Sequence, residues 1–113
     1  MSDELEKQLR AACLAAIHGP QIEFAAVKYL DDLYKAIEAG ELTWRDGDGP
    51  RGSRALNGTS PNYNVMVVQY NTGTHIDHAG MFTLLAPNAG INVIVIPKPF
   101  ANWIFHKAQG ARN

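Results

Sequence analysis

In the first forty residues, apolar side chains recur every three or four positions, which is the spacing of one face of an α-helix. The first stripe consists of Leu5, Leu9, Ala12, Cys13, Ala16 and Ile17. Gly19 and Pro20 end it, and a second stripe runs up to Gly40 through Ile22, Ala26, Tyr29, Leu30, Leu33 and Ile37. Because the link between the stripes is short, the pattern predicts an antiparallel helical hairpin over residues 1–40.

From residue 63 onward the pattern changes to short runs of β-branched and aromatic residues, which strands prefer. It predicts strands over residues 63–70, 81–86 and 91–96, with a turn at 87–90 between the last two. Residues 100–108 fit the periods of both helix and strand, and we favour a helix. We therefore predict an α+β fold: an N-terminal antiparallel helical hairpin, a small, mainly antiparallel sheet of about three to five strands, and a C-terminal helix or strand.

Two segments are less regular. Residues 41–62 are rich in Gly, Pro, Asn and Arg, which is the composition of turns, so we predict a Gly/Arg-rich loop there. In residues 75–85, Thr74 and Asp77 have the spacing of a helix capping box, which allows a helix. Gly80 in the middle of that segment and the aromatic and β-branched residues after it favour a strand.

The composition narrows the class of protein. The chain has 113 residues, of which 46% are apolar and 19% charged. A chain of this length buries about two thirds of its surface, so we expect one domain over residues 1–113. The net charge of −1 gives no strong nucleic-acid signal, and no apolar run has the length of a membrane span. The acidic N-terminus lacks a signal-peptide pattern and Cys13 is the only cysteine, so we expect a cytoplasmic protein without an intrachain disulfide.

Asp77 is the only formally charged residue between Ala55 and Pro97, and both faces of the predicted sheet are apolar. Two short helices can cover one face, so the other needs the C-terminal segment or a second copy of the chain. We therefore expect a homodimer. The predicted interface residues are Met66, Val68, Tyr70, Trp103 and Phe105. The alternative is that residues 100–105 fold back as core aromatics and seal the second face.

His75, Asp77 and His78 form a compact polar cluster. Imidazole and carboxylate groups bind divalent metals and serve in acid–base catalysis, so these three residues are candidate ligand-binding and metal residues. On a strand His75 and Asp77 share a face and His78 points away, whereas on a helical turn His75 and His78 share a face. A polar turn held by local hydrogen bonds is the alternative. No cofactor is predicted other than such a metal.

The segment from His75 to Gly80 resembles the end of the metal motif of metallo-β-lactamase-type hydrolases, a His-x-Asp-His followed by Ala-Gly. In that family another His stands two positions earlier, where this chain has Gly73, and further ligands follow in a longer chain. Neither the reaction nor the cofactor is therefore carried over.

Arg45, Arg51 and Arg54 lie among glycines and are candidate ligands for a phosphate or carboxylate group. The Gly-Lys-Ser/Thr ending of a P-loop is missing from this segment, so nucleotide binding of that kind is not predicted. A solvated, mobile loop is the alternative.

These features favour a small cytoplasmic, non-enzymatic binding or interaction protein that acts as a homodimer, with the size of an accessory protein of a phage or mobile element. One alternative is a small histidine-using enzyme, a hydrolase or ribonuclease, that combines the cluster at residues 75–78 with His106 and an arginine. Another is a binder of a small anionic ligand at a dimer seam, with a site formed by the Arg45–Arg54 loop and by His75, Asp77 and His78. The expected partners are a second copy, another protein or a small anion, with no membrane.

Overall fold

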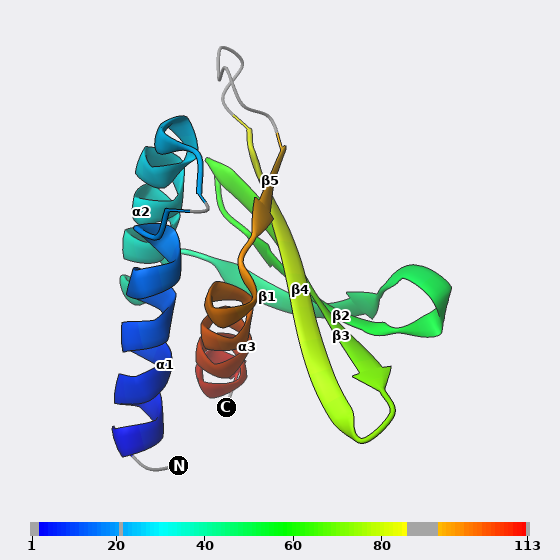
Figure 1. Ribbon diagram of the computed structural model, residues 1–113. Coiled ribbons are helices and arrows are strands. Elements are labelled where there is room, and N and C mark those ends of the chain that lie inside the picture. Colours follow the sequence, from blue (N-terminus) through cyan, green and yellow to red (C-terminus); the bar gives the residue numbers. More distant parts are fainter. Residues whose placement is uncertain (1–2, 21, 86–92, 113) are drawn as a thin grey trace.

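The computed structural model describes residues 3–20, 22–85 and 93–112. In chain order its elements are α1 (Asp3–Ile17), α2 (Phe24–Glu38), β1 (Thr43–Asp48), a 3₁₀ turn (Pro50–Gly52), β2 (Arg54–Thr59), β3 (Tyr63–Thr72), β4 (His75–Leu84), β5 (Val93–Ile96) and α3 (Lys98–Arg112). The strands form one antiparallel sheet in the order β1-β2-β3-β4-β5, so each strand pairs with the next in the chain. The predicted α+β class, the helical hairpin and the C-terminal helix are confirmed (Figure 1).

The predicted loop over residues 41–62 is wrong for most of its length, because β1 and β2 form a hairpin there. Trp44 pairs directly with Gly58, and a Cβ atom added at Gly58 would lie 2.5 Å from the Trp44 ring. Gly58 is therefore a strand residue that makes room for an indole, not a turn residue. The polar sequence of β1 is compatible with its place at the edge of the sheet, where one side of a strand is unpaired.

The segment 75–85 is a strand, as favoured, and not a helix. β4 begins at His75 and pairs with β3 without interruption through Leu84. Gly80 fits this strand because it pairs with Ile96, and a Cβ at Gly80 would lie 3.3 Å from the Ile96 Cδ1 atom. The predicted strands at 81–86 and 91–96 therefore appear as parts of β4 and β5. Residues 86, 91 and 92 and the predicted turn at 87–90 lie outside the described residues.

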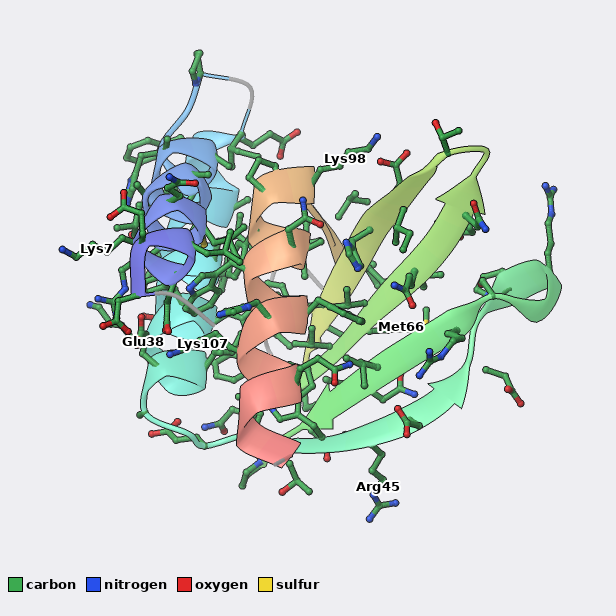
Figure 2. The ribbon with its side chains drawn as sticks, turned by 90° about the horizontal axis from the view of Figure 1, so that it is seen from below. Lys7, Glu38, Arg45, Met66, Lys98 and Lys107 are labelled. Atoms are coloured by element: carbon green, nitrogen blue, oxygen red, sulfur yellow. The ribbon has the colours of Figure 1, made fainter. Side chains whose placement is uncertain are left out.

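Helix α3 packs between the helical hairpin and the sheet. Its Trp103 ring stacks on Tyr34 of α2 at 4.6 Å between ring centroids, and its Phe105 ring lies 4.4 Å from the ring of His78 on β4. Five of its residues are completely buried, namely Phe100, Ala101, Trp103, Ile104 and Ala108. All three helices lie on the same side of the sheet (Figures 1 and 2). The alternative in which the C-terminal aromatics seal the second face of the sheet is therefore wrong.

The register of β3, β4 and β5 determines which residues face the helices. Val65 pairs with Phe82 and Phe82 with Ile94, and all three are buried in the core. The side chains of the residues next to them in the sequence point to the opposite face of the sheet. The structure thus has one sheet face covered by helices and one face whose cover is not supplied by any described helix.

Candidate functional site

Asp77 and His78, two residues of the His-Asp-His cluster, have different surroundings. Asp77 and His78 are consecutive on β4, so their side chains leave on opposite faces of the sheet. The Asp77 carboxylate pairs with the Lys98 ammonium at 3.5 Å. His78 lies on the helix-covered face, where its Nδ1–H donates to the Oδ1 atom of Asn102. The side chain of His75 is outside the described part of the structure.

A metal site at this cluster would need its ligands to point at one ion, and an extended strand separates Asp77 from His78. Among the described residues, no group of three or more His, Cys, Asp or Glu side chains is placed to hold a metal ion. His106, named in the enzyme alternative, lines a different hollow between the helices. Among the described groups proposed for acid–base chemistry, Asp77, His78 and His106 thus lie in different parts of the molecule.

The arginines are divided in a similar way. Arg51 and Arg54 line a hollow of about 620 Å³ between the β1–β2 turn and the β3–β4 hairpin, together with Gln69 and Tyr70. Arg45 does not line that hollow, and it projects away from the body of the molecule (Figure 2). Two of the three predicted anion-binding residues therefore meet at one place, and the third does not.

The sheet face turned away from the helices carries exposed apolar side chains. Val95 pairs with Met81, and Met81 pairs with the half-buried Met66, so these three apolar side chains form a row across three strands. The exposed fraction is 77% for Val95, 57% for Val93 and 41% for Met81. We call this surface the open face and define it by these residues, Met66, Met81, Val93 and Val95.

The predicted interface residues lie only partly on the open face. Met66 is half-buried within it, and Tyr70 is half-buried at the end of the sheet, where it lines the arginine hollow. Val68 is buried, and a Cβ at Gly49 would lie 3.1 Å from its Cγ1 atom, so the β1–β2 turn covers it. Trp103 is in the core, and Phe105 is half-buried against His78. These positions remove Trp103 and Phe105 from the proposed contact surface.

The sequence did not identify Val93, Val95 and Met81 as contact residues. Alternation along a strand separates its residues into two sets, but it does not show which set faces the helices. That choice is made when α3 packs on the sheet. The signal available in the sequence was the apolar character of both sets.

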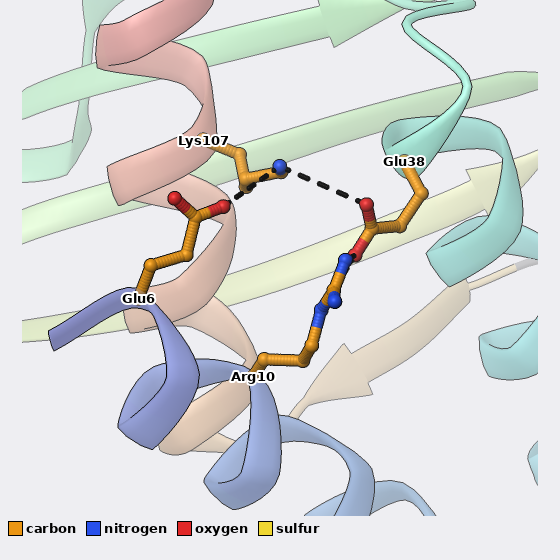
Figure 3. A network of polar contacts seen from close by, with 4 residues as sticks. All are labelled: Glu6, Arg10, Glu38 and Lys107. Carbon is orange, nitrogen blue, oxygen red and sulfur yellow. Dashed lines mark hydrogen bonds and ion pairs between the residues drawn. The ribbon is translucent and has the colours of Figure 1, made fainter. Parts of the chain in front are cut away.

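A second group that the sequence did not indicate is a network of ion pairs joining the three helices (Figure 3). The Lys107 ammonium lies 3.0 Å from a Glu6 carboxylate oxygen and 3.7 Å from one of Glu38, and the Arg10 Nε donates to Glu38 at 3.0 Å. The network borders a hollow of about 770 Å³ that Trp44 also lines. Two carboxylates and two cations balance each other here, so the arrangement serves to hold the helices together.

The network also shifts the pKa values of two side chains, Glu38 and Cys13. Burial on its own raises the pKa of Glu38, but hydrogen bonds from Arg10 and Tyr34 and the charge of Lys107 bring it below its ordinary value of 4.5. For Cys13, burial and the charge of Glu38 raise the pKa of the thiol to about 12, which agrees with a structural and unreactive cysteine.

A carboxyl group whose pKa is lower in the folded than in the unfolded protein stabilises the fold above its unfolded pKa, and this contribution is lost as the pH falls through the folded pKa. We expect Glu38→Gln to lower the free energy of unfolding at pH 7 by about 1 kcal/mol and to flatten its decline below about pH 4.5. Urea unfolding at several pH values measures both effects. Glu41→Gln, an exposed residue outside the network, is the control, and equal pH profiles for Glu38→Gln and the wild type would contradict the prediction.

Comparisons of the chain with models of protein families, with curated proteins and with solved structures find no match. None of the helices in the described residues has the length and apolarity needed to cross a membrane. Function must therefore be inferred from the chain's own surfaces.

Proposed function

We propose that this protein is a small, non-enzymatic interaction protein that acts as a homodimer, with the open face as the contact between two copies. The observation that carries the proposal is the row formed by Val95, Met81 and Met66 on the side of the sheet opposite the helices. Exposed apolar side chains that are contiguous mark a contact surface, whereas single ones are common on any protein.

The size of the open face agrees with a modest interface. Strands β3 to β5, at about 4.8 Å spacing and about six residues of 3.3 Å each, present roughly 300 Å² of flat area. This is within the range of a few hundred Å² at which exposed apolar patches usually have a function. Two such faces in contact bury about 600 Å² in total, which is below the roughly 1,200 Å² of stable protein–protein contacts, so we expect a weak dimer with a dissociation constant in the micromolar range or above.

The charges around the open face favour a second copy over a strongly charged partner. Its rim carries both signs, with Arg45 on β1 and the pair of Asp77 and Lys98 at the other edge. The polar neighbours within the sheet, such as Asn64 and Thr83, are uncharged and pair with each other across β3 and β4. Two such faces can pack as two sheets about 10 Å apart without placing one sign of charge against itself.

Sedimentation of the wild type at about 10–200 µM tests the proposal, with a dimer of two 12.4 kDa chains expected at the higher concentrations. Val95→Lys should give a monomer, because it places a charge within the contact, at its most exposed apolar side chain, without disturbing the core. Circular dichroism checks that the variant is folded.

The matched control is Phe24→Lys, which removes an apolar side chain that is 94% exposed on α2, on the other side of the sheet. It should dimerise like the wild type. A wild type that stays monomeric at all these concentrations, or a dimer that is lost in Phe24→Lys and kept in Val95→Lys, would refute the open face as the contact.

A further inference from the structure

The hollow that contains Arg51 and Arg54 has two walls of different chemistry. One wall is the β1–β2 turn, which supplies both guanidinium groups. The other is the end of the β3–β4 hairpin, where Tyr70 and Ile76 line the same hollow. Ile76 is 60% exposed although it lies on the helix-covered side of β4, because α3 does not extend over this end of the strand. An exposed apolar side chain thus faces two cations across a recess of about 620 Å³.

The wall that carries the two arginines contains no carboxylate. Among the described residues, none that lines the hollow is acidic. Among the side chains that the structure describes, no carboxylate oxygen lies within 4.0 Å of Arg51 or Arg54. Asp48 lies directly across the strand ladder from Arg54, and Asp46 lines a smaller neighbouring hollow with Arg54, but neither carboxylate residue lines this recess. Asp77, opposite Tyr70, is paired with Lys98. Among the described residues, the lining of the recess therefore carries two cations and no anion.

The turn that carries Arg51 is held in place by its own hydrogen bonds. The Gly49 amide donates to the Ser53 carbonyl at 2.7 Å, and the Ser53 amide and hydroxyl both donate to the Pro50 carbonyl, at 3.1 and 2.6 Å. Arg51 adopts a left-handed backbone conformation with φ of 56°, which is unfavourable for a residue with a side chain. On the other wall, Gln69 pairs with Arg54 across β2 and β3, so the two side chains leave the sheet on the same face as direct neighbours and line the same hollow.

We propose that this hollow binds a phosphate monoester, with the phosphate group held by Arg51 and Arg54 and its organic substituent placed against Ile76. A phosphate dianion has three terminal oxygens, which suit two guanidinium forks and the neighbouring amides of Gln69 and Asn71 better than the two oxygens of a carboxylate do. The exposed Ile76 favours a phosphate ester over free phosphate as the ligand, because only the ester has an apolar group that can cover this side chain.

Phenyl phosphate is the probe, titrated into ¹⁵N-labelled protein at constant ionic strength. We expect saturable shifts of the amide signals of residues 51–54 and 69–71, with a dissociation constant of about 1 mM or below. Inorganic phosphate should bind at least about threefold more weakly, and Ile76→Ser should abolish that difference. Running the titration also on Val95→Lys separates the site from dimer formation, because the two proposals concern different surfaces.

The decisive variants are Arg54→Gln and Arg51→Gly, each of which should weaken binding about tenfold or more. Arg51→Gly removes the guanidinium and places at this position the residue that best tolerates a left-handed backbone, so we expect the variant to stay folded, which circular dichroism checks. The matched control is Arg45→Gln, an exposed arginine outside the hollow, which should bind within about twofold of the wild type. The proposal is overturned if no variant differs from Arg45→Gln, if benzoate binds as well as phenyl phosphate, or if no saturable binding occurs.

Discussion

Replacing Trp103 by alanine is expected to destabilise the protein by about 3–5 kcal/mol, the range for a large aromatic residue removed from a core. Trp103 is completely buried, stacks on Tyr34 at 4.6 Å and meets Phe100 with 5.7 Å between ring centroids. It therefore connects α3 to α2, and alanine would leave a cavity in the layer between helices and sheet. The free energy of unfolding in urea, followed by circular dichroism, measures the change.

Trp103→Phe separates the effect of packing from that of the indole nitrogen. The Nε1 atom of Trp103 is buried and has no hydrogen-bond partner among the described residues. A phenyl ring keeps an aromatic surface for Tyr34 and removes an unsatisfied polar group, which offsets part of the lost volume. We expect Trp103→Phe to cost about 1–2 kcal/mol, well below the alanine variant. Equal losses in the two variants would show that the stacked aromatic contact does not support the fold.

The second large effect is expected in β5. Ile94 is 8% exposed and pairs with Phe82 on the helix-covered face, so Ile94→Ala should cost about 2–5 kcal/mol. Val95, the next residue, is 77% exposed on the open face, and Val95→Ala should change the stability of the monomer by less than about 0.5 kcal/mol. Both are measured by urea unfolding at a protein concentration below that of dimer formation.

This pair of neighbours tests the orientation of the sheet directly. Comparable losses for Ile94→Ala and Val95→Ala would mean that both faces of β5 are covered in the monomer, and a small loss for Ile94→Ala with a large one for Val95→Ala would mean that the faces are exchanged. Either result would also remove the basis of the proposed dimer contact, since the open face is defined by the same alternation.

The β1–β2 hairpin could not be predicted from local sequence composition. A segment containing Gly47, Gly49, Gly52 and Gly58 has the composition of a loop, yet two of these glycines lie in paired strands. Gly58 is a strand residue because the Trp44 ring occupies the place of its side chain. Such a contact depends on register between two strands, which composition does not contain.

The elements with a local signal could be predicted from the amino-acid sequence. Cys13, Ile17, Leu30 and Leu33 of the helical stripes are buried as predicted, whereas Leu5 at the start of the first stripe is 40% exposed. The β-branched runs of β3 and β5 are strands, because periods of this kind are properties of consecutive residues. Three features follow only from packing in three dimensions: which sheet face α3 covers, that Asp77 and His78 belong to different surfaces, and that Glu6 and Lys107 meet across the helices. These features depend on packing between segments that are distant in the chain. An apolar stripe indicates that one face of an element is buried, but it does not indicate which other element that face packs against.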